Sequence, residues 1–466
     1  MGSIWSAQDQ QEFAQRGWSL DEADSQLKML RDRGSSVSVF RPCTAGDGIH
    51  ILSSEERHTT LGIGSKILSD RNMCSRFIPA SGAASRMFAA LQGELLESEE
   101  KMLQQRAQDL PFWSNSQREL LESMSPVDRS LQAREWMIDP KVGWGHLPKG
   151  LIPFHRYPGG QVRSCFEEHF REWKLLAGDA SLHFTVPQHY QQHINSLYQR
   201  KGVTTSIQSP STDTLAWDIV SNAIARNSDG TLLFRPGGHG ALLTNLGSIK
   251  TSFILIRNID NVVPGGRMAA RNKEQQILLG QCAKLVQERD ALLSRLDCGA
   301  PRWLNDANEW LRMFDTNLGD TVTVERLIWS LDRPIRVAGM VVNEGAPGGG
   351  PFWIRKGNGR SVPSIVESSE LPSGGLNRGT HYNPVDIVCN LQRFDGNRYN
   401  LQQFADQNRY LTCDKDWHGN AIRILERPGL WNGGMDEWLT QFIEVPSSTF
   451  APVKTVFDLL DPIRRN

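Results

Sequence analysis

Short apolar runs alternate with stretches of helical periodicity along most of the chain. The apolar runs, which end in polar or small residues, predict buried strands at 76–79, 183–186, 252–264 and 335–342, and further strands near 232, at 363–368 and at 383–391. Apolar positions at helical spacing predict helices at 85–96, 187–198, 273–296 and 303–314, and a mostly helical stretch over 94–133. Strands that alternate with helices predict an α/β fold with parallel strands at the centre of its sheet.

The first 70 residues differ from the rest in their pattern. Residues 8–33 have helical spacing, and Ser19 is placed to cap a second helix whose first turn contains Asp21 and Glu22. The run at 36–40 is either an edge strand or a connector. We therefore expect a helical N-terminal extension over residues 1–70. One large α/β domain should follow over residues 71–460, with a helical insertion at about 268–330.

Composition narrows the classes of function. The formal net charge of this 466-residue chain is −1, so no global field is available to bind nucleic acid or an anionic membrane. The seven cysteines are scattered and are not spaced as metal ligands or as a redox pair, which indicates reduced thiols. The N-terminus lacks the pattern of a signal peptide, and no apolar run approaches the length of a membrane span. We expect a soluble cytoplasmic protein.

The stretch "PASGAASRM" connects a predicted strand to a predicted helix through small residues. In parallel sheets, ligands bind beyond the carboxyl ends of the strands, and a helix start presents backbone N–H groups to an anion. Gly82 would let the backbone approach a phosphate closely, and Arg86 would clamp it. From these residues alone, a tight turn with Arg86 in a surface ion pair is an equal alternative.

Five later features carry polar groups that suit a phosphate site. Lys149 lies in "KGLIP", and Lys454 lies in "FAPVKTVFDLL". The loop "RPGGHG" offers a flat backbone surface to a planar base, and Asp260 ends an apolar strand in a position to bind Mg²⁺. Each has a plainer interpretation: a solvated lysine, an ordinary loop or a turn cap. In "THYNPVD", Asn383 and Asp386 are oxygen ligands or sugar contacts.

The order of these motifs resembles that of the UDP-sugar pyrophosphorylase superfamily of nucleotidyltransferases. "PASGAASRM" is similar to the family's Gly-rich first loop, "KGLIP" to its lysine motif and "RPGGHGA" to its uridine-binding motif. "NIDNV" resembles the strand end whose Asp holds the metal, "HYNPVD" a later Asn motif, and "FAPVKTVFDLL" the late lysine motif. Ala84 and Ala241 depart from the pattern, because the family has Gly and an acidic residue there. The chain also resembles, from about Phe77 to Leu460, an uncharacterised bacterial family with similar motifs.

The resemblance implies a Rossmann-like, GT-A type nucleotidyltransferase core with a mixed, mainly parallel sheet. It implies transfer of a nucleoside monophosphate from a nucleoside triphosphate, UTP or CTP, to a small phosphorylated acceptor such as a sugar 1-phosphate, with Mg²⁺ as cofactor. The implied catalytic residues are Arg86, Lys149 and Lys454, and the implied metal ligands are Asp260 and Asp386. Nucleotide contacts fall on Ala80, Ser81, Gly82, Ala83, Ala84, Ser85, Gly237, Gly238, His239 and Gly240. We place the acceptor against Asp213, Glu344, Glu367, His381 and Asn383.

Three alternatives stay open at this point. The acceptor is either a sugar phosphate or another molecule, such as a phosphonate. A nucleotide-sugar-dependent glycosyltransferase has the same fold type, but that class usually shows Asp-x-Asp where this chain reads Asp260-Asn261. A catalytically inactive nucleotide-binding protein is the third alternative. The departures at Ala84 and Ala241 keep it open, whereas the presence of Arg86, Lys149, Asp260 and Lys454 together argues against it.

Overall fold

The computed structural model describes residues 4–464 except 33–36, 140–143, 199–201, 296–300, 315–322, 346–347, 358, 372–378 and 383. Its helices are α1 (Ala7–Arg16), α2 (Leu20–Asp32), α3 (Ser54–Leu68), α4 (Ser85–Phe88), α5 (Glu97–Arg106), α6 (Asn115–Ser123), α7 (Pro126–Ile138), α8 (Cys165–Ala177), α9 (Gln191–Tyr198), α10 (Leu243–Ser248), α11 (Met268–Ser294), α12 (Pro301–Leu311) and α13 (Val324–Leu331). None of the described helices combines the length and the apolar character that a membrane crossing requires.

The strands are β1 (Val39–Pro42), β2 (Thr44–Ala45), β3 (Gly48–His50), β4 (Cys74–Pro79), β5 (Pro153–Arg156), β6 (Val162–Ser164), β7 (Ser181–Thr185), β8 (Val203–Ser206), β9 (Thr214–Asp218), β10 (Ala223–Ile224), β11 (Phe234–Arg235), β12 (Phe253–Ile256), β13 (Ile335–Met340), β14 (Gly350–Arg355), β15 (Ser361–Val366), β16 (Asp386–Asn390), β17 (Leu411–Trp417), β18 (Asn420–Glu426) and β19 (Leu439–Glu444).

A nine-stranded sheet forms the centre of the molecule, in the order β2-β3-β19-β13-β16-β12-β4-β7-β8. Only β16 runs antiparallel to both of its neighbours among the pairs described, and the other pairs are parallel. The predicted mixed, mainly parallel α/β sheet is therefore confirmed. Because β4, β7, β8, β12, β13 and β19 run in one direction, the loops that follow them emerge at one edge.

Each face of this sheet is buried by a different layer, as the alternation of side chains along its strands requires. Ile78 and Phe184 pack on one face against α8, α9 and α11, and Phe77 and Ile256 pack on the other against α10. The sheet β1-β14-β15 adds Trp353 and Ile365 to this second layer. The helix α11 was expected to belong to an insertion, but it covers the sheet and carries a large share of the first layer.

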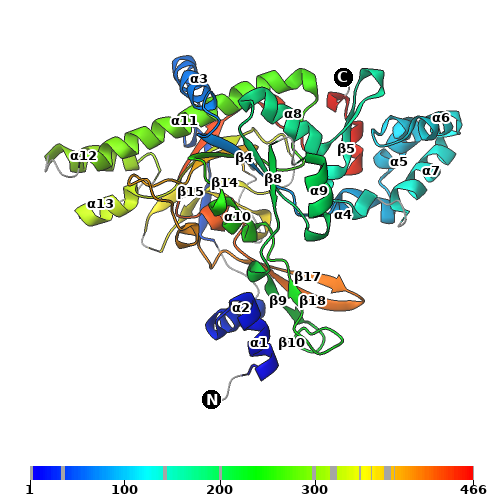
Figure 1. Cartoon of the computed structure of the whole chain (residues 1–466), viewed down its shortest axis with the longest axis horizontal. Coiled ribbons are helices and arrows are strands. Elements are labelled where there is room, and N and C mark those ends of the chain that lie inside the picture. Colours follow the sequence, from blue (N-terminus) through cyan, green and yellow to red (C-terminus); the bar gives the residue numbers. More distant parts are fainter. Residues whose placement is uncertain are drawn as a thin grey trace.

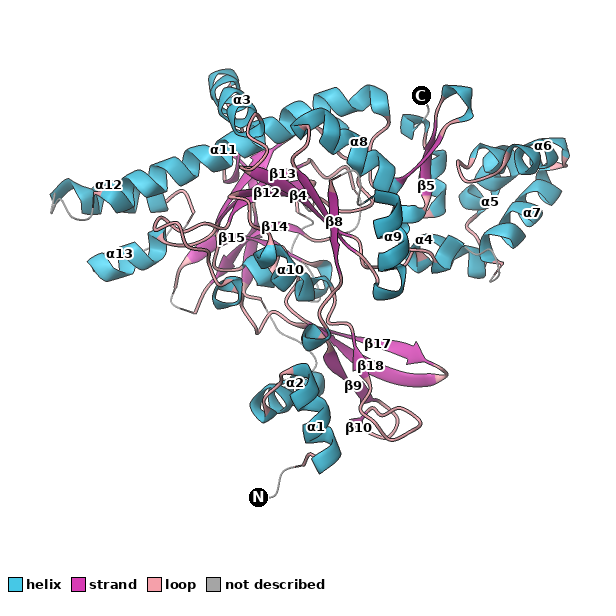
Figure 2. Ribbon diagram, viewed as in Figure 1, coloured by secondary structure: helices cyan, strands magenta, loops and turns pink. Residues whose placement is uncertain are grey.

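Two peripheral groups stand beside this core. The helices α4 to α7 are inserted between β4 and β5 and lie beside the sheet (Figure 2). Their core around Phe88, Leu103 and Trp113 is shared with the C-terminal residues Val453, Phe457 and Leu460. The helices α1 and α2 pack on the sheet of β9, β10, β11, β17 and β18 (Figure 1), where Phe13 and Leu27 meet Trp217. The expected extension over residues 1–70 is shorter than predicted, because residues 39–50 form strands in two sheets and α3 packs on α11.

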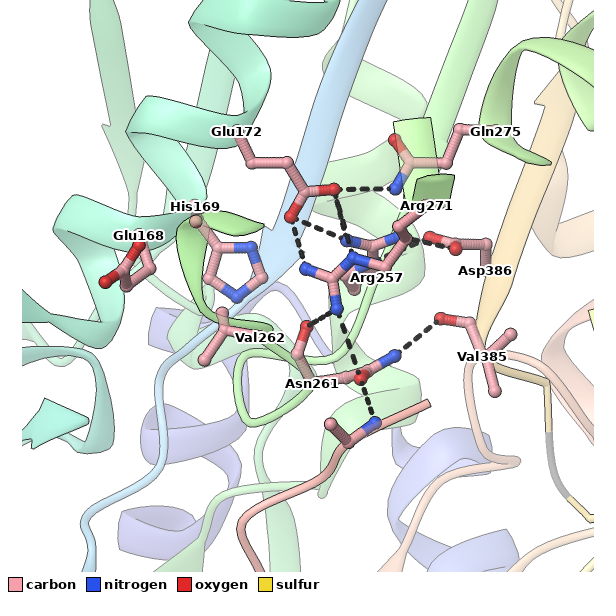
Figure 3. A network of polar contacts seen from close by, with 12 residues as sticks. Glu168, His169, Glu172, Arg257, Asn261, Val262, Arg271, Gln275, Val385 and Asp386 are labelled. Carbon is pink, nitrogen blue, oxygen red and sulfur yellow. Dashed lines mark hydrogen bonds and ion pairs between the residues drawn. The ribbon is translucent and has the colours of Figure 1, made fainter. Parts of the chain in front are cut away.

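A buried ionic cluster joins the sheet to α8 and α11 (Figure 3). Glu172 accepts hydrogen bonds from Arg257 at 2.6 and 2.9 Å, and it is also bonded to Arg271. Arg76 on β4 lies 3.7 Å from the same carboxylate. Burial opposes the ionised form of Glu172, but the three guanidinium groups outweigh it and hold the pKa of Glu172 well below its ordinary value. The cluster ties β4, the end of β12, α8 and α11 together.

The contact between α3 and α11 gives a test of this packing. A side chain at Gly280 would overlap the carbonyl oxygen of Thr60. We expect Gly280→Ala to lower the free energy of unfolding by about 1–3 kcal/mol, because the overlap exceeds the gain of about 1 kcal/mol in helix propensity. The matched control is Gly62→Ala on the exposed side of α3, which meets nothing within 4 Å and should be neutral or stabilising. Equal urea denaturation midpoints for the two variants would contradict the close packing of the helices.

Candidate functional site

Four segments that are distant in sequence meet at the carboxyl edge of the main sheet. The turn after β4 pairs with the segment before Lys149, where the Ala84 N–H donates to the Leu147 carbonyl at 2.9 Å. The Lys149 N–H donates to the Gly82 carbonyl at 3.4 Å. On the other side, the Val453 N–H donates to the Asp260 carbonyl at 3.0 Å. The structure thus brings the predicted residues Gly82, Lys149, Asp260 and Lys454 into one site.

Asp260 is the charged centre of this site. It is 8% exposed, and its Oδ2 atom accepts hydrogen bonds from Lys149 Nζ at 3.2 Å and Lys454 Nζ at 3.1 Å. Burial opposes ionisation of Asp260, but the two ammonium groups outweigh it and hold the pKa of Asp260 below its ordinary value. The side chain of Lys149 is 16% exposed, whereas that of Lys454 is 54% exposed. One carboxylate therefore faces two cations, and the local excess of positive charge suits an anionic ligand.

The backbone around Asp260 is fixed from below by buried side chains. His169 donates from Nε2 to the Ile259 carbonyl at 2.8 Å, and Arg271 donates to the Asn261 carbonyl at 3.2 Å. The Asn261 side chain accepts from the Ala451 N–H at 3.0 Å and donates to the Val385 carbonyl at 3.4 Å. Burial lowers the pKa of His169 to about 3, so this histidine is neutral at physiological pH. The loop that carries Asp260 is rigidly placed.

The turn after β4 has an open outer side. Gly82, Ala83, Ser85 and Arg86 are exposed, and a side chain at Gly82 would meet nothing within 4 Å. Arg86 forms no hydrogen bond or ion pair in the described part of the chain, so the predicted alternative of a surface ion pair has no partner there. The helix expected over 85–96 is shorter, since α4 ends at Phe88 and a 3-10 turn follows.

The inner side of this turn explains the unusual alanine. Ala84 is 1% exposed, packs into the core of α4 to α7, and has φ −76° and ψ 9°. An alanine adopts this conformation without strain, so no glycine is required there. Ala80 is buried too, and its N–H donates to the Thr185 carbonyl at 3.1 Å. The side chain of Ser81 is partly buried.

In the loop "RPGGHG", close packing accounts for two of the glycines. A side chain at Gly237 would lie 2.5 Å from the Thr212 carbonyl oxygen, and one at Gly240 would overlap the Pro428 carbonyl. Gly238 has φ +71°, which favours glycine. His239 accepts from the Leu430 N–H at 3.3 Å, and its ring centroid lies 4.8 Å from that of Trp431. Packing contacts and backbone conformation therefore explain most of the residues in this loop. Ala241 is buried beneath it.

His239 also links this loop to the turn after β4. Desolvation by the surrounding protein atoms is the main cause of the lowered pKa of His239. The charge of Arg86 acts in the same direction, and Glu426 acts against it. The charge of Arg86, in the turn after β4, thus acts on His239 in the second loop that the sequence assigned to the nucleotide.

The residues assigned to the acceptor fall into two places. His381 and Glu367 lie together beside the glycines of residues 348–350, since a side chain at Gly350 would lie 2.7 Å from the His381 carbonyl. His381 is buried and contacts Glu444 at 3.0 Å. Glu344 is exposed in the loop after β13. Asp213 lies elsewhere, next to the Gly237 loop, where its carbonyl accepts from Arg427 at 3.5 Å. Asn383 is outside the described residues.

The second predicted metal ligand is already engaged. Both carboxylate oxygens of Asp386 accept from Arg257, at 2.7 and 2.5 Å. Asp386 thus belongs to the buried ionic cluster, although Val385 lies beside Asn261. Within the described ranges, no three His, Cys, Asp or Glu side chains form a group that could hold a metal.

Sequence reasoning missed the residues that support the site. Glu172, His169, Arg257 and Arg271 carry no motif, and Glu444 is the last residue of an ordinary apolar strand. The sequence does mark these residues as charged side chains next to or within apolar patterns. Arg257 directly follows the apolar run "FILI", and Glu172 lies in the amphipathic α8.

The lowered pKa of Asp260 has a consequence for stability. A carboxyl group whose folded pKa lies below its unfolded value of about 3.8 stabilises the fold above that pH, and this contribution is lost as the pH falls further. We expect Asp260→Asn to lower the free energy of unfolding by about 2 kcal/mol at pH 6, which allows for the exposure of Lys454. Urea titrations should show this difference shrinking below pH 4. A difference that is constant from pH 3 to 7 would show that Asp260 is not ionised in this pairing.

Comparison with known proteins adds a family but no activity. No curated protein matches the chain. Among solved structures, that of a protein described as a UDP-N-acetylglucosamine pyrophosphorylase, from Entamoeba histolytica, is 12% identical, with 86% of this chain and 79% of that chain covered and a TM-score of 0.43. A likeness at that score supports no conclusion, so the function has to be argued from the site. Residues 6–465 match the domain of unknown function DUF4301, and the chain therefore belongs to that family.

Proposed function

We propose that this chain is a nucleotidyltransferase that transfers a nucleoside monophosphate from a nucleoside triphosphate to a small phosphorylated acceptor and releases pyrophosphate. The observation that carries the proposal is the convergence of two lysines on Asp260. Lys149 and Lys454 lie 111 and 194 residues from Asp260 along the chain, yet both donate to one oxygen of it. A GT-A type core is part of the same proposal.

The triphosphate would lie along the open side of the turn after β4. The exposed backbone at Gly82 and Ala83 admits a phosphate, and the free guanidinium of Arg86 pairs with it. The base would lie toward Gly238 and His239, which are near Arg86. This loop favours a pyrimidine base by its resemblance to the uridine motif, and UTP is our first choice before CTP.

The reaction would join two anions in front of Lys149 and Lys454. An acceptor phosphate oxygen attacks the α-phosphorus, the bond from that phosphorus to the bridging oxygen breaks, and the electron pair leaves with pyrophosphate. No general base is required, because a phosphate acceptor is already ionised at pH 7. The two ammonium groups neutralise charge that builds up in the transition state, where preorganised charge contributes most. The region around His381 and Glu367 would hold the rest of the acceptor.

Asp260 also has an atom that fits a divalent cation. Its Oδ1 is buried and has no hydrogen-bond partner in the described structure. One carboxylate oxygen, with waters and substrate phosphates, is a common ligand set for Mg²⁺. When bound, Mg²⁺ would neutralise charge on the triphosphate. Asp386 is omitted from this proposal because Arg257 holds both of its oxygens.

Two other functions are less well supported. A glycosyltransferase of this fold type usually has Asp-x-Asp at the metal, but the positions two residues before and after Asp260 are Asn258 and Val262. An inactive nucleotide-binding protein was suggested by Ala84 and Ala241. Both alanines are buried, so neither position offers a side chain to a ligand.

Pyrophosphate release tests the proposal directly. The protein is incubated with Mg²⁺, each of the four nucleoside triphosphates, and a panel of sugar phosphates and phosphonates. Asp260→Asn and Lys454→Ala should each lower the rate about 100-fold or more with the productive pair. Lys101→Ala, which removes an exposed lysine paired only with Glu97, is the control and should keep the rate. If no pair of substrates gave pyrophosphate, the result would favour an inactive nucleotide-binding protein. If the protein only transferred a sugar from a nucleotide sugar, the result would favour a glycosyltransferase.

Gly82 gives a second test, because the space that a side chain at this position would occupy is open. We expect Gly82→Val to raise the KM for the nucleoside triphosphate about tenfold or more by blocking the approach of the phosphates, with little change in Tm. Gly93→Val is the matched control, since Gly93 also has nothing within 4 Å but lies beyond the turn. An unchanged KM in Gly82→Val would place the triphosphate elsewhere.

A further inference from the structure

Arg464 is a buried arginine in the segment that follows Lys454, and the function proposed above does not use it. It is 5% exposed, and its guanidinium donates mainly to backbone carbonyls. Nε donates to the Asp458 carbonyl at 3.0 Å, Nη1 donates to the Val262 carbonyl at 3.2 Å, and Nη2 donates to the Ala451 carbonyl. One side chain thus joins three separate stretches of backbone.

These three carbonyls surround the two central residues of the site. Ala451 precedes Lys454, and Asp458 follows it. Val262 lies two residues after Asp260, and the residue between them, Asn261, forms a β-bridge with Pro452. The guanidinium therefore clamps both ends of the turn that carries Lys454 to the loop that carries Asp260.

The turn itself is closed by Asp458. The Asp458 carboxylate accepts from the backbone N–H groups of Lys454 and Thr455, each at 2.7 Å. Because the carbonyl of the same residue accepts from Arg464, a shift of the guanidinium would be transmitted to the backbone of Lys454. The Lys454 side chain is about half exposed, so little other packing holds it in place.

A buried histidine fixes the far side of Arg464. Nη1 lies 3.3 Å from His155 Nε2, which must accept because a guanidinium only donates. His155 Nδ1 then carries the proton and donates to Glu168 at 3.0 Å, and the Tyr157 hydroxyl donates to the same oxygen at 2.7 Å. Burial lowers the pKa of His155, Glu168 acts against this, and the charge of Arg464 adds to it. A neutral His155 in one tautomer therefore holds the guanidinium in one orientation.

We propose that Arg464 is a positioning residue that sets Lys454 Nζ against Asp260. Loss of the guanidinium would remove the donor that it supplies to the Ala451 and Val262 carbonyls and to His155, and would leave the Asp458 carbonyl with the Asp461 N–H at 3.3 Å. The turn of Lys454 would move to recover hydrogen bonds. A role for Arg464 in catalysis rests on the proposed function, but its control of the contact between Lys454 and Asp260 does not.

The reactivity of the Lys454 amine tests the proposal without any substrate. Because the Lys454 ammonium donates a hydrogen bond to Asp260 Oδ2 at 3.1 Å, its amine should acylate slowly. Trace labelling with acetic anhydride, read by mass spectrometry, gives the rate at Lys454 relative to the exposed Lys101. Arg464→Ala should raise this ratio about tenfold, because the amine loses its hydrogen bond to Asp260, and Arg464→Lys should raise it less.

Arg289→Ala separates positioning from a general loss of stability. Arg289 is 1% exposed and also donates to backbone carbonyls, those of Arg333 and Gln392, at 3.4 and 3.2 Å. The variant Arg289→Ala should lower the urea denaturation midpoint as Arg464→Ala does, but leave the labelling of Lys454 unchanged. If Arg464→Ala left the ratio unchanged, or raised it no more than Arg289→Ala, the proposal would be wrong. If Arg464→Ala did not fold, the ratio in Arg464→Lys would decide in the same way.

Activity then separates the two proposals. With a productive substrate pair, Arg464→Ala should lower kcat while the KM for the nucleoside triphosphate stays within about twofold, because the guanidinium acts through Lys454 and not on the nucleotide. If the wild-type protein released no pyrophosphate while Lys454 labelling rose in Arg464→Ala, the proposed function would fail and the positioning role would stand. If the wild type were active and the variant matched it in both measurements, only the positioning role would fail.

Discussion

The buried carboxylate of Glu172 is the interaction on which the rest of the structure depends. It is surrounded by Arg76, Arg257 and Arg271, which come from β4, the end of β12, and α11. Removing a single partner from such a buried cluster leaves an uncompensated charge, which costs about 3–5 kcal/mol. The cluster therefore fixes the position of strand ends that would otherwise be held only by non-directional apolar packing. The loop with Asp260 begins directly after Arg257, so the charge cluster and the candidate site share one piece of backbone.

The site above this cluster follows a simple electrostatic logic. Asp260 alone would be a buried anion, and Lys149 and Lys454 make its ionised form stable. The same lysines, together with Arg86, leave the site with more positive than negative charge, which suits two phosphorylated substrates. The backbone beneath Asp260 is rigid, whereas the Lys454 side chain above it is half exposed and free to move. This arrangement is what reaction between two anions requires, since most of the catalysis would come from position and charge.

The sequence predicted the sheet and the gathering of the motifs, but not the supports. Strand and helix patterns are local, so β4, β7, β12 and α11 were found from their periodicity. The strands β17 and β18 were missed because charged residues such as Asp414 and Lys415 interrupt the apolar pattern of an exposed sheet. Glu172 and Arg464 could not be found, because their partners are distant in sequence and carry no motif. At Gly237 and Gly240, close contact with Thr212 and Pro428 is by itself sufficient to require glycine, so the sequence pattern alone does not identify a ligand there.

The central claim is that the carboxylate of Asp260 and the open turn at Gly82 bind one metal–triphosphate ligand. A crystal structure of the protein with Mn²⁺ and a non-hydrolysable nucleoside triphosphate analogue tests it most directly, because Mn²⁺ has an anomalous signal and replaces Mg²⁺ at oxygen ligands. The account predicts an anomalous peak beside Asp260 Oδ1, with the phosphates between the Gly82 turn and the two lysines. A triphosphate bound away from this turn, or a metal bound without Asp260, would contradict it.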